Sequence, residues 1–230
     1  MSRAALALVL CALLAPTLAA QDAGAPPSCE IRGHLSISDL HVLRPPGVLT
    51  LRSFEDRDVR VTPLGGGRFR VRTHGEGARI DGSTDQPVPI VLGSAHTFLG
   101  VATVAAGTAV DAIERVGDAF RGSLVVHEGV TIQRAPMTCL DLRAQPPTDG
   151  ALEARPIARG PIWHARVWRF RLRAIGTDDS PPLLLELTPE ARAAIPWTEG
   201  RRVAGWVEVR ATLAHALFDG WARDTDLTLP

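Results

Sequence analysis

Apolar and polar residues alternate with a period of two along most of the chain, which is the pattern of β-strands. The alternation is strict in residues 58–62 and 68–73, and the glycine-rich residues 63–67 between them predict a hairpin loop. Many short strands separated by Gly and Pro indicate an all-β fold of two small antiparallel β-barrel or sandwich domains. Further strands are expected at 30–36, 48–51, 78–81, 88–92, 98–104, 109–113, 122–127, 130–133 and 139–142.

The second half of the sequence continues this pattern and adds one helix. Residues 168–174 alternate cleanly, so we expect Trp168 to point inward with the other apolar residues of that strand. Thr188-Pro189-Glu190 supplies an N-cap, a first-position proline and an acidic first turn. One short helix is therefore expected near 189–195, and it ends at Pro196. Further strands are expected at 183–187, 205–213 and 220–222.

The N-terminus has the pattern of a secretory signal peptide. Arg3 precedes an apolar stretch at Ala4–Leu14, and small residues follow at 17–20. The stretch is shorter than the roughly 20 apolar residues of a membrane-spanning helix. We expect residues 1–20 to be removed, residues 21–28 to be a flexible leader, and the mature chain to be exported. It would then be periplasmic or secreted, with no transmembrane segment.

A Pro- and Gly-containing break at 144–150 suggests a domain boundary. It predicts an N-terminal β domain at 29–142, a linker at 143–150 and a C-terminal β domain at 151–230. Removal of residues 1–20 leaves two cysteines, Cys29 and Cys139, near the ends of the first domain. In an oxidising compartment we expect them to form a disulfide, which would stabilise the fold by about 4–5 kcal/mol. Two buried free thiols are the alternative.

The C-terminal residues resemble a known family. Gly220-Trp221 with Leu227 shortly after it, preceded by Trp206-Val207-Glu208-Val209, is similar to the end of bacterial Src-homology-3-like (SH3b) domains. The resemblance implies a small β-barrel on an exported protein. Such domains bind cell-wall peptide or glycan, or act as spacers beside a catalytic domain.

The balanced charge and the lack of known catalytic and metal-binding motifs argue against several classes of function. Lys plus Arg and Asp plus Glu number 25 each, so no net charge favours nucleic acid. No local metal-ligand pattern such as HExxH is present among the seven histidines, and no GxSxG or SxxK nucleophile motif occurs. We therefore expect no cofactor and no metal, and we assign no catalytic residue. A pair formed by Ser94 and His96 would lack an orienting third group.

Two sets of residues are candidates for ligand binding. Three arginines on one strand face could grip carboxylates or phosphates, and Arg70 and Arg171 are the central residues of two such rows. The alternative is a solvated face balanced by acidic residues on the next strand. Trp197, Trp206 and Trp221 are candidates for lining a groove, and plain packing is the alternative.

The sequence thus predicts an exported bacterial module without catalytic activity, in a binding or structural role. Its partner would be a cell-envelope polymer or protein. Two alternatives stay open: an extracytoplasmic hydrolase whose site is assembled from distant residues, and an assembly subunit that joins partners through edge strands.

Overall fold

The structure is a computed structural model that describes residues 30–37, 40–44, 47–51, 54–65, 67–75, 78–117, 119–153 and 160–230. Within these ranges, only the backbone is described for residues 37–56, 65 and 74–81. The chain is all-β with one short helix, as the sequence predicts, and none of its three sheets closes into a barrel. In the described part, no helix is long and apolar enough to cross a membrane.

The first sheet is an N-terminal meander extended by two later strands. The predicted hairpin is confirmed, because β4 and β5 pair antiparallel and Gly67 turns between them with φ +74°. Val61 lies opposite Val71, and both are buried on the inner face. The sheet has the order β3-β2-β6-β5-β4-β1-β13-β7. Its strands are β1 (Ile31–Ile37), β2 (Leu40–Arg44), β3 (Gly47–Leu51), β4 (Phe54–Gly65), β5 (Arg68–Gly75), β6 (Ala78–Thr84), β7 (Ile90–Leu92) and β13 (Leu142–Ala144).

The second sheet has the order β10-β11-β12-β16-β15 and contains strands from both halves of the chain. Val130 pairs with Leu187 and Ile132 pairs with Leu185, and all four side chains are buried. The strands are β10 (Val110–Val116), β11 (Ala119–His127), β12 (Val130–Met137), β15 (Arg169–Leu172) and β16 (Leu183–Leu187).

The third sheet has the order β20-β14-β17-β18-β19-β9-β8 and also crosses the two halves, because β19 pairs with β9. Two 3-10 turns, Cys139–Asp141 and Asp224–Asp226, lead into β13 and β20. The strands are β8 (His96–Phe98), β9 (Ala102–Val104), β14 (Ile162–Ala165), β17 (Trp197–Val203), β18 (Trp206–Thr212), β19 (Ala216–Arg223) and β20 (Leu227–Thr228).

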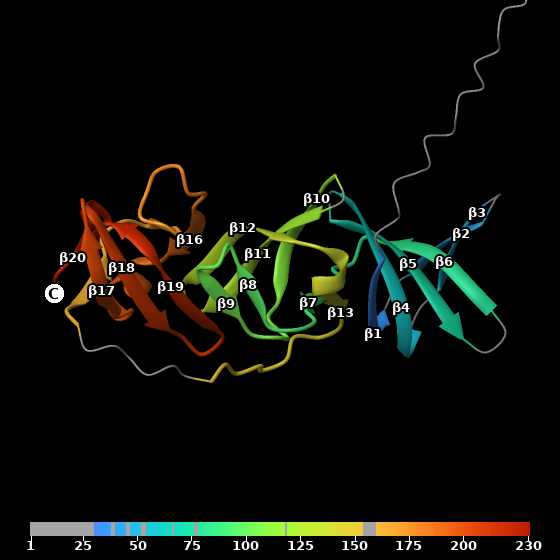
Figure 1. Cartoon of the computed structure of the whole chain (residues 1–230). Coiled ribbons are helices and arrows are strands. Elements are labelled where there is room, and N and C mark those ends of the chain that lie inside the picture. The colour runs from blue at the N-terminus through green and yellow to red at the C-terminus, as the bar shows by residue number, and fades with distance from the viewer. Residues whose placement is uncertain are drawn as a thin grey trace, which may run out of the picture.

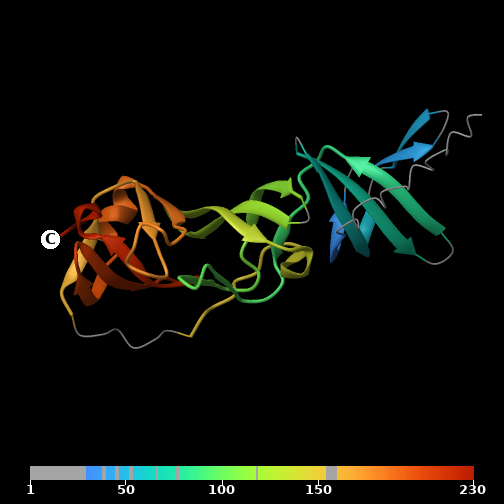
Figure 2. The same cartoon turned by 45° about the horizontal axis from the view of Figure 1, so that its top comes forward.

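The predicted division at 143–150 does not coincide with a division between sheets. Figure 1 shows β1–β6 at one end, β7–β13 in the middle and β14–β20 at the other end, and Figure 2 shows the same order. The middle strands join both ends through hydrogen-bonded pairs. The Pro- and Gly-rich break marks a connection between strands, because such residues report local turns and not which strands pair across the chain.

The helix α1 (Pro189–Ala194) follows the prediction closely. Thr188 caps it, because its Oγ1 accepts a hydrogen bond from the Ala191 backbone N–H at 3.3 Å, and Pro189 occupies the first turn. Backbone hydrogen bonding at the helix start lowers the pKa of Glu190. The helix ends one residue before the expected Ile195, whose side chain packs into the core.

An aromatic cluster lies in the core. Trp197 is fully buried between Phe170 and Phe218, at ring-centroid distances of 4.8 and 5.7 Å.

The expectation that Trp168 points inward is wrong, because 52% of this residue is exposed. β15 begins one residue later, at Arg169, so Trp168 lies at the strand entrance, where the Arg169 guanidinium covers its ring at 4.2 Å.

Candidate functional site

The outer face of the third sheet carries the polar residues of β18 and β19. Val207 and Val209 point into the core, so the alternation of a strand places Glu208 and Arg210 on the opposite face. Asp219 of β19 lies directly opposite Arg210 in the strand register. This outer face therefore presents charged and hydroxyl side chains above an apolar interior.

A pocket of about 370 Å³ lies on this face and is lined by residues of β8, β9, β14, β17, β18 and β19. Arg210 and Asp219 belong to its lining and form an ion pair, with 3.1 Å between Nε and Oδ2. Apolar side chains complete the wall, including Ile162, Pro196 and Leu217. Four threonines supply hydroxyl groups: Thr97, Thr103, Thr198 and Thr212.

The polar groups of the pocket offer both donors and acceptors. The hydroxyls of Thr97 and Thr103 share a hydrogen bond of 2.9 Å across β8 and β9. Arg210 also lies 3.6 Å from Glu208, so two carboxylates neutralise its charge. A neutral set of hydroxyls with one guanidinium–carboxylate pair suits a polar uncharged ligand better than an anion.

A second polar group lies beside the pocket. Glu208 accepts two hydrogen bonds from Arg201, of 2.9 Å from Nε and 3.2 Å from Nη2. These bonds lower the pKa of Glu208 below its ordinary value of 4.5. The pKa of Asp226, the residue just before β20, is shifted in the opposite direction, because burial raises it above its ordinary value of 3.8.

The stability of the Glu208→Gln variant should depend less on pH, at acidic pH, than the stability of the unchanged chain. A depressed folded-state pKa means that Glu208 stabilises the fold above about pH 4.5 and loses this contribution as the pH falls through the lower value. At pH 7 we expect a loss of about 1 kcal/mol, since Arg201 is largely exposed and water screens the pair. Urea midpoints at pH 7 and pH 3 measure the difference, which should shrink in the variant.

The Asp226→Asn variant is the control with the opposite sign. The raised folded-state pKa of Asp226 means that its contribution is present below pH 3.8 and is lost as the pH rises through the folded value. Removing this carboxylate should therefore make the variant more stable than the unchanged chain at pH 7, and the difference should be smaller at pH 3. If the fall in stability between pH 7 and pH 3 were the same in Glu208→Gln as in the unchanged chain, the role assigned to the hydrogen bonds from Arg201 would be contradicted.

The three tryptophans predicted to line a groove do not form one. Trp197 has no exposed surface and belongs to the core, so its assignment to the groove is wrong. Trp206 does point to the outer face, but it is only 6% exposed. Trp221 is half-buried on the same face, two residues beyond Asp219 and so next to the pocket. Ligand contact by Trp221 stays a prediction.

A loop between β15 and β16 covers these two outer tryptophans. A Cβ atom added at Gly176 would lie 3.0 Å from the Trp221 ring and 3.1 Å from Trp206, so the loop packs directly on both. Arg223 lies over the Trp206 ring at 4.2 Å and is paired with Asp178 of the loop. The strand alternation gives the direction of Trp206 correctly but contains no information on a covering loop.

The two predicted arginine rows lie on different sheets. Arg70 is exposed on β5 and Arg171 is exposed on β15. Their neighbours in each row have acidic partners, which fits the charge-balanced alternative: Arg72 with Glu30, Arg68 with Asp85, and Arg169 with Glu186. Binding by Arg70 and Arg171 stays a prediction, and the structure does not bring them together.

A histidine–aspartate pair is the feature that sequence reasoning missed. His96 Nδ1 lies 3.2 Å from Asp141 Oδ1, and the other oxygen of Asp141 accepts hydrogen bonds of 2.7 Å from the backbone and hydroxyl of Thr138. The two residues are far apart in the sequence, so no local motif joins them. Neither lines the pocket above, and Ser94 is an exposed residue at a bend.

Among the described residues, no group of three or more His, Cys, Asp or Glu side chains could hold a metal ion.

The predicted disulfide falls partly outside the described residues. Cys139 is half-buried in a 3-10 turn. Cys29 is not among the described residues, so the pairing stays a prediction.

Comparisons with known proteins give no relative. No protein family, no curated protein and no solved structure matches the chain.

Proposed function

We propose that the chain is a non-catalytic binding module of an exported protein, and that its pocket on the third sheet holds a hydroxyl- and amide-rich polymer of the cell envelope. The observation that carries this proposal is the pocket itself, in which four threonines surround the Arg210–Asp219 pair. Hydroxyl groups both donate and accept hydrogen bonds. They match the mixed donors and acceptors of sugar hydroxyls and peptide amides, which a cell-wall polymer carries together.

The surroundings of the pocket support a binding role. Apolar wall residues beside polar groups are the usual composition of a ligand pocket. The half-buried Trp221 adds an aromatic group next to Asp219 on the same strand face. The residues that resemble SH3b domains form β18, the end of β19 and β20, which are the strands on and beside this face.

Export is the second part of the proposal. It rests on the apolar stretch Ala4–Leu14 and the small residues after it, which lie outside the described residues. A cell-wall polymer is accessible only to an exported chain, so the two parts of the proposal agree with each other.

Removing two pocket hydroxyls should weaken binding to purified peptidoglycan. Valine has nearly the shape of threonine, so the double variant Thr103→Val, Thr212→Val should fold while losing two hydroxyl contacts. We expect about a tenfold weaker association, at roughly 0.5–1.5 kcal/mol for each hydrogen bond. Co-sedimentation of the full chain with purified sacculi measures it. The matched control is Thr177→Val, Thr225→Val, which changes two exposed threonines outside the pocket.

The outcomes separate the proposal from its alternatives. Equal retention of both double variants would remove this pocket as the binding site. Release of soluble fragments from the sacculi, abolished by His96→Ala, would instead support the hydrolase alternative through the His96–Asp141 pair. Elution of the pure chain at a multiple of its monomer mass would support the assembly alternative.

A further inference from the structure

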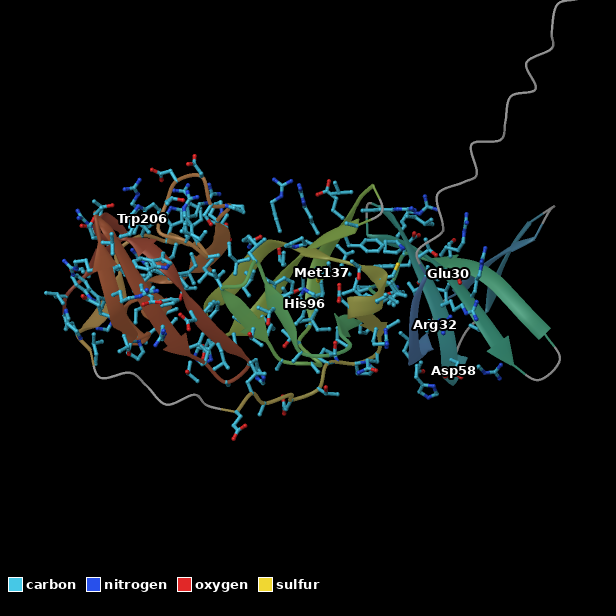
Figure 3. All side chains as sticks on the ribbon, viewed as in Figure 1. Glu30, Arg32, Asp58, His96, Met137 and Trp206 are labelled. Carbon is cyan, nitrogen blue, oxygen red and sulfur yellow. The ribbon has the colours of Figure 1, made fainter. Side chains whose placement is uncertain are left out.

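A second pocket lies at the other end of the molecule and differs in chemistry. It has a volume of about 440 Å³ and lies where β13 meets β1 and β4. Figure 3 places Arg32 and Asp58 in the N-terminal sheet, far from Trp206 at the opposite end. Its charged and polar lining residues are Arg32, His34, Asp58, Arg60, Arg143 and Gln145.

The strand register forces guanidinium groups together at this pocket. Arg32 of β1 lies directly opposite Arg60 of β4, and Arg60 lies directly opposite Arg72 of β5. Directly opposed side chains on neighbouring strands have Cβ atoms about 4.5–5.5 Å apart, and like charges in this position destabilise a sheet. A row of three arginines across three strands therefore requires negative charge nearby.

Acidic residues lie beside two of these three arginines. Glu30 pairs with Arg72 at 2.5 Å and with Arg60 at 3.4 Å, and Asp81 of β6 is the residue directly opposite Arg72 in the register. Asp58, the acidic residue in the lining, lies 3.3 Å from His34 Nδ1. No carboxylate of the described residues lies within ion-pair distance of Arg32.

Arg143 adds a second guanidinium without a carboxylate. Its Nη1 donates to the backbone carbonyls of Leu142 at 2.8 Å and Leu140 at 3.3 Å. These bonds orient the side chain and leave its charge uncompensated, because among the described residues no carboxylate pairs with it. The pocket lining thus carries three arginines against one aspartate.

We propose that this pocket binds a phosphate group through Arg32 and Arg143, which lie beside the Glu30-paired Arg60. A phosphate monoester carries close to two negative charges at neutral pH, which matches the two guanidinium groups, Arg32 and Arg143, that have no carboxylate partner among the described residues. Guanidinium groups bind its oxygens in pairs, with a geometry that lysine lacks. A single carboxylate would leave one positive charge without a partner. This site is independent of the threonine pocket proposed above, which lies on a different sheet.

The phosphate could belong to a soluble ester or to a lipid head group, and two probes separate these sources. Glycerol 3-phosphate presents the group in solution, and vesicles containing phosphatidic acid present it on a membrane. Binding of both probes defines a phosphate-group site, and binding of the vesicles alone defines a lipid-surface site. If acetate bound with the same affinity as glycerol 3-phosphate, the site would not select a doubly charged group, and the proposal would be overturned.

The test is calorimetry of the full chain with glycerol 3-phosphate, and flotation with the vesicles. The variant Arg32→Ala, Arg143→Ala should weaken binding of the phosphate probe by about tenfold or more, since it removes two charge-assisted contacts. Binding by the unchanged chain should also weaken as salt rises from about 0.02 to 0.15 M. The variant Arg32→Lys, Arg143→Lys keeps both charges and should bind with intermediate affinity.

A charge-matched control shows whether the effect is local. Arg121→Ala, Arg166→Ala removes two exposed arginines outside the pocket and should bind the probe like the unchanged chain. Thermal unfolding of all three variants confirms that each remains folded. An equal loss in the control, or unchanged binding in Arg32→Ala, Arg143→Ala, overturns the proposal. Absence of binding of either probe by the unchanged chain overturns it as well.

Discussion

Replacing Trp197 by alanine should lower the free energy of unfolding by about 3–5 kcal/mol, the cost of deleting a fully buried large aromatic side chain. Trp197 has no exposed surface, and it packs between Phe170 of the second sheet and Phe218 of the third. Its removal would leave a cavity where the two sheets meet. Urea unfolding followed by circular dichroism measures the loss.

The comparison that makes this result specific is Trp168→Ala. Trp168 is 52% exposed at the entrance of β15, so its removal should change stability by less than about 1 kcal/mol. Equal effects of the two substitutions would contradict the packing described here. A Trp197→Phe variant that remains folded and binds sacculi normally would separate the structural role of Trp197 from ligand contact.

Replacing Gly33 by valine should also be severely destabilising, by about 3 kcal/mol or more, because overpacking against backbone cannot relax through a flexible side chain. A Cβ atom at Gly33 would lie 1.9 Å from the carbonyl oxygen of Ala144, so any larger residue pushes β13 away from β1. Gly33 also lines the arginine pocket. The substitution should therefore weaken phosphate binding along with stability, and a thermal melt with a binding titration measures both.

Gly67→Ala provides the reference for Gly33→Val. Gly67 has a positive φ of 74° and no atom within 4 Å of an added Cβ, so only the cost of the left-handed backbone remains, about 1–2 kcal/mol. A larger loss from Gly67→Ala than from Gly33→Val would show that the approach of β13 to β1 is looser than the structure has it.

The local features of the fold were accessible from the sequence. Alternation gives the inward face of β4 and β5, glycine gives the turn at Gly67, and Thr188 with Pro189 gives the start of the helix. Each depends on residues close together in the chain, where propensity and side-chain direction act directly.

The pairing of distant strands was not accessible. Nothing in residues 130–133 indicates that their partner is 184–187, because many apolar strands are compatible with one another. Both proposed sites depend on such pairings. Arg32 becomes significant only beside Arg60 and Arg143, and Thr103 only beside β19. The covering of Trp206 by a loop is equally a property of the folded chain.

The pairing of β9 with β19 has a consequence for how the molecule is made. Ala102–Val104 and its partner Ala216–Phe218 are separated in the sequence by the strands β10 to β18. The β8–β9 pair therefore gains this neighbour only after Ala216–Phe218 has been synthesised, and contacts between such distant segments form slowly.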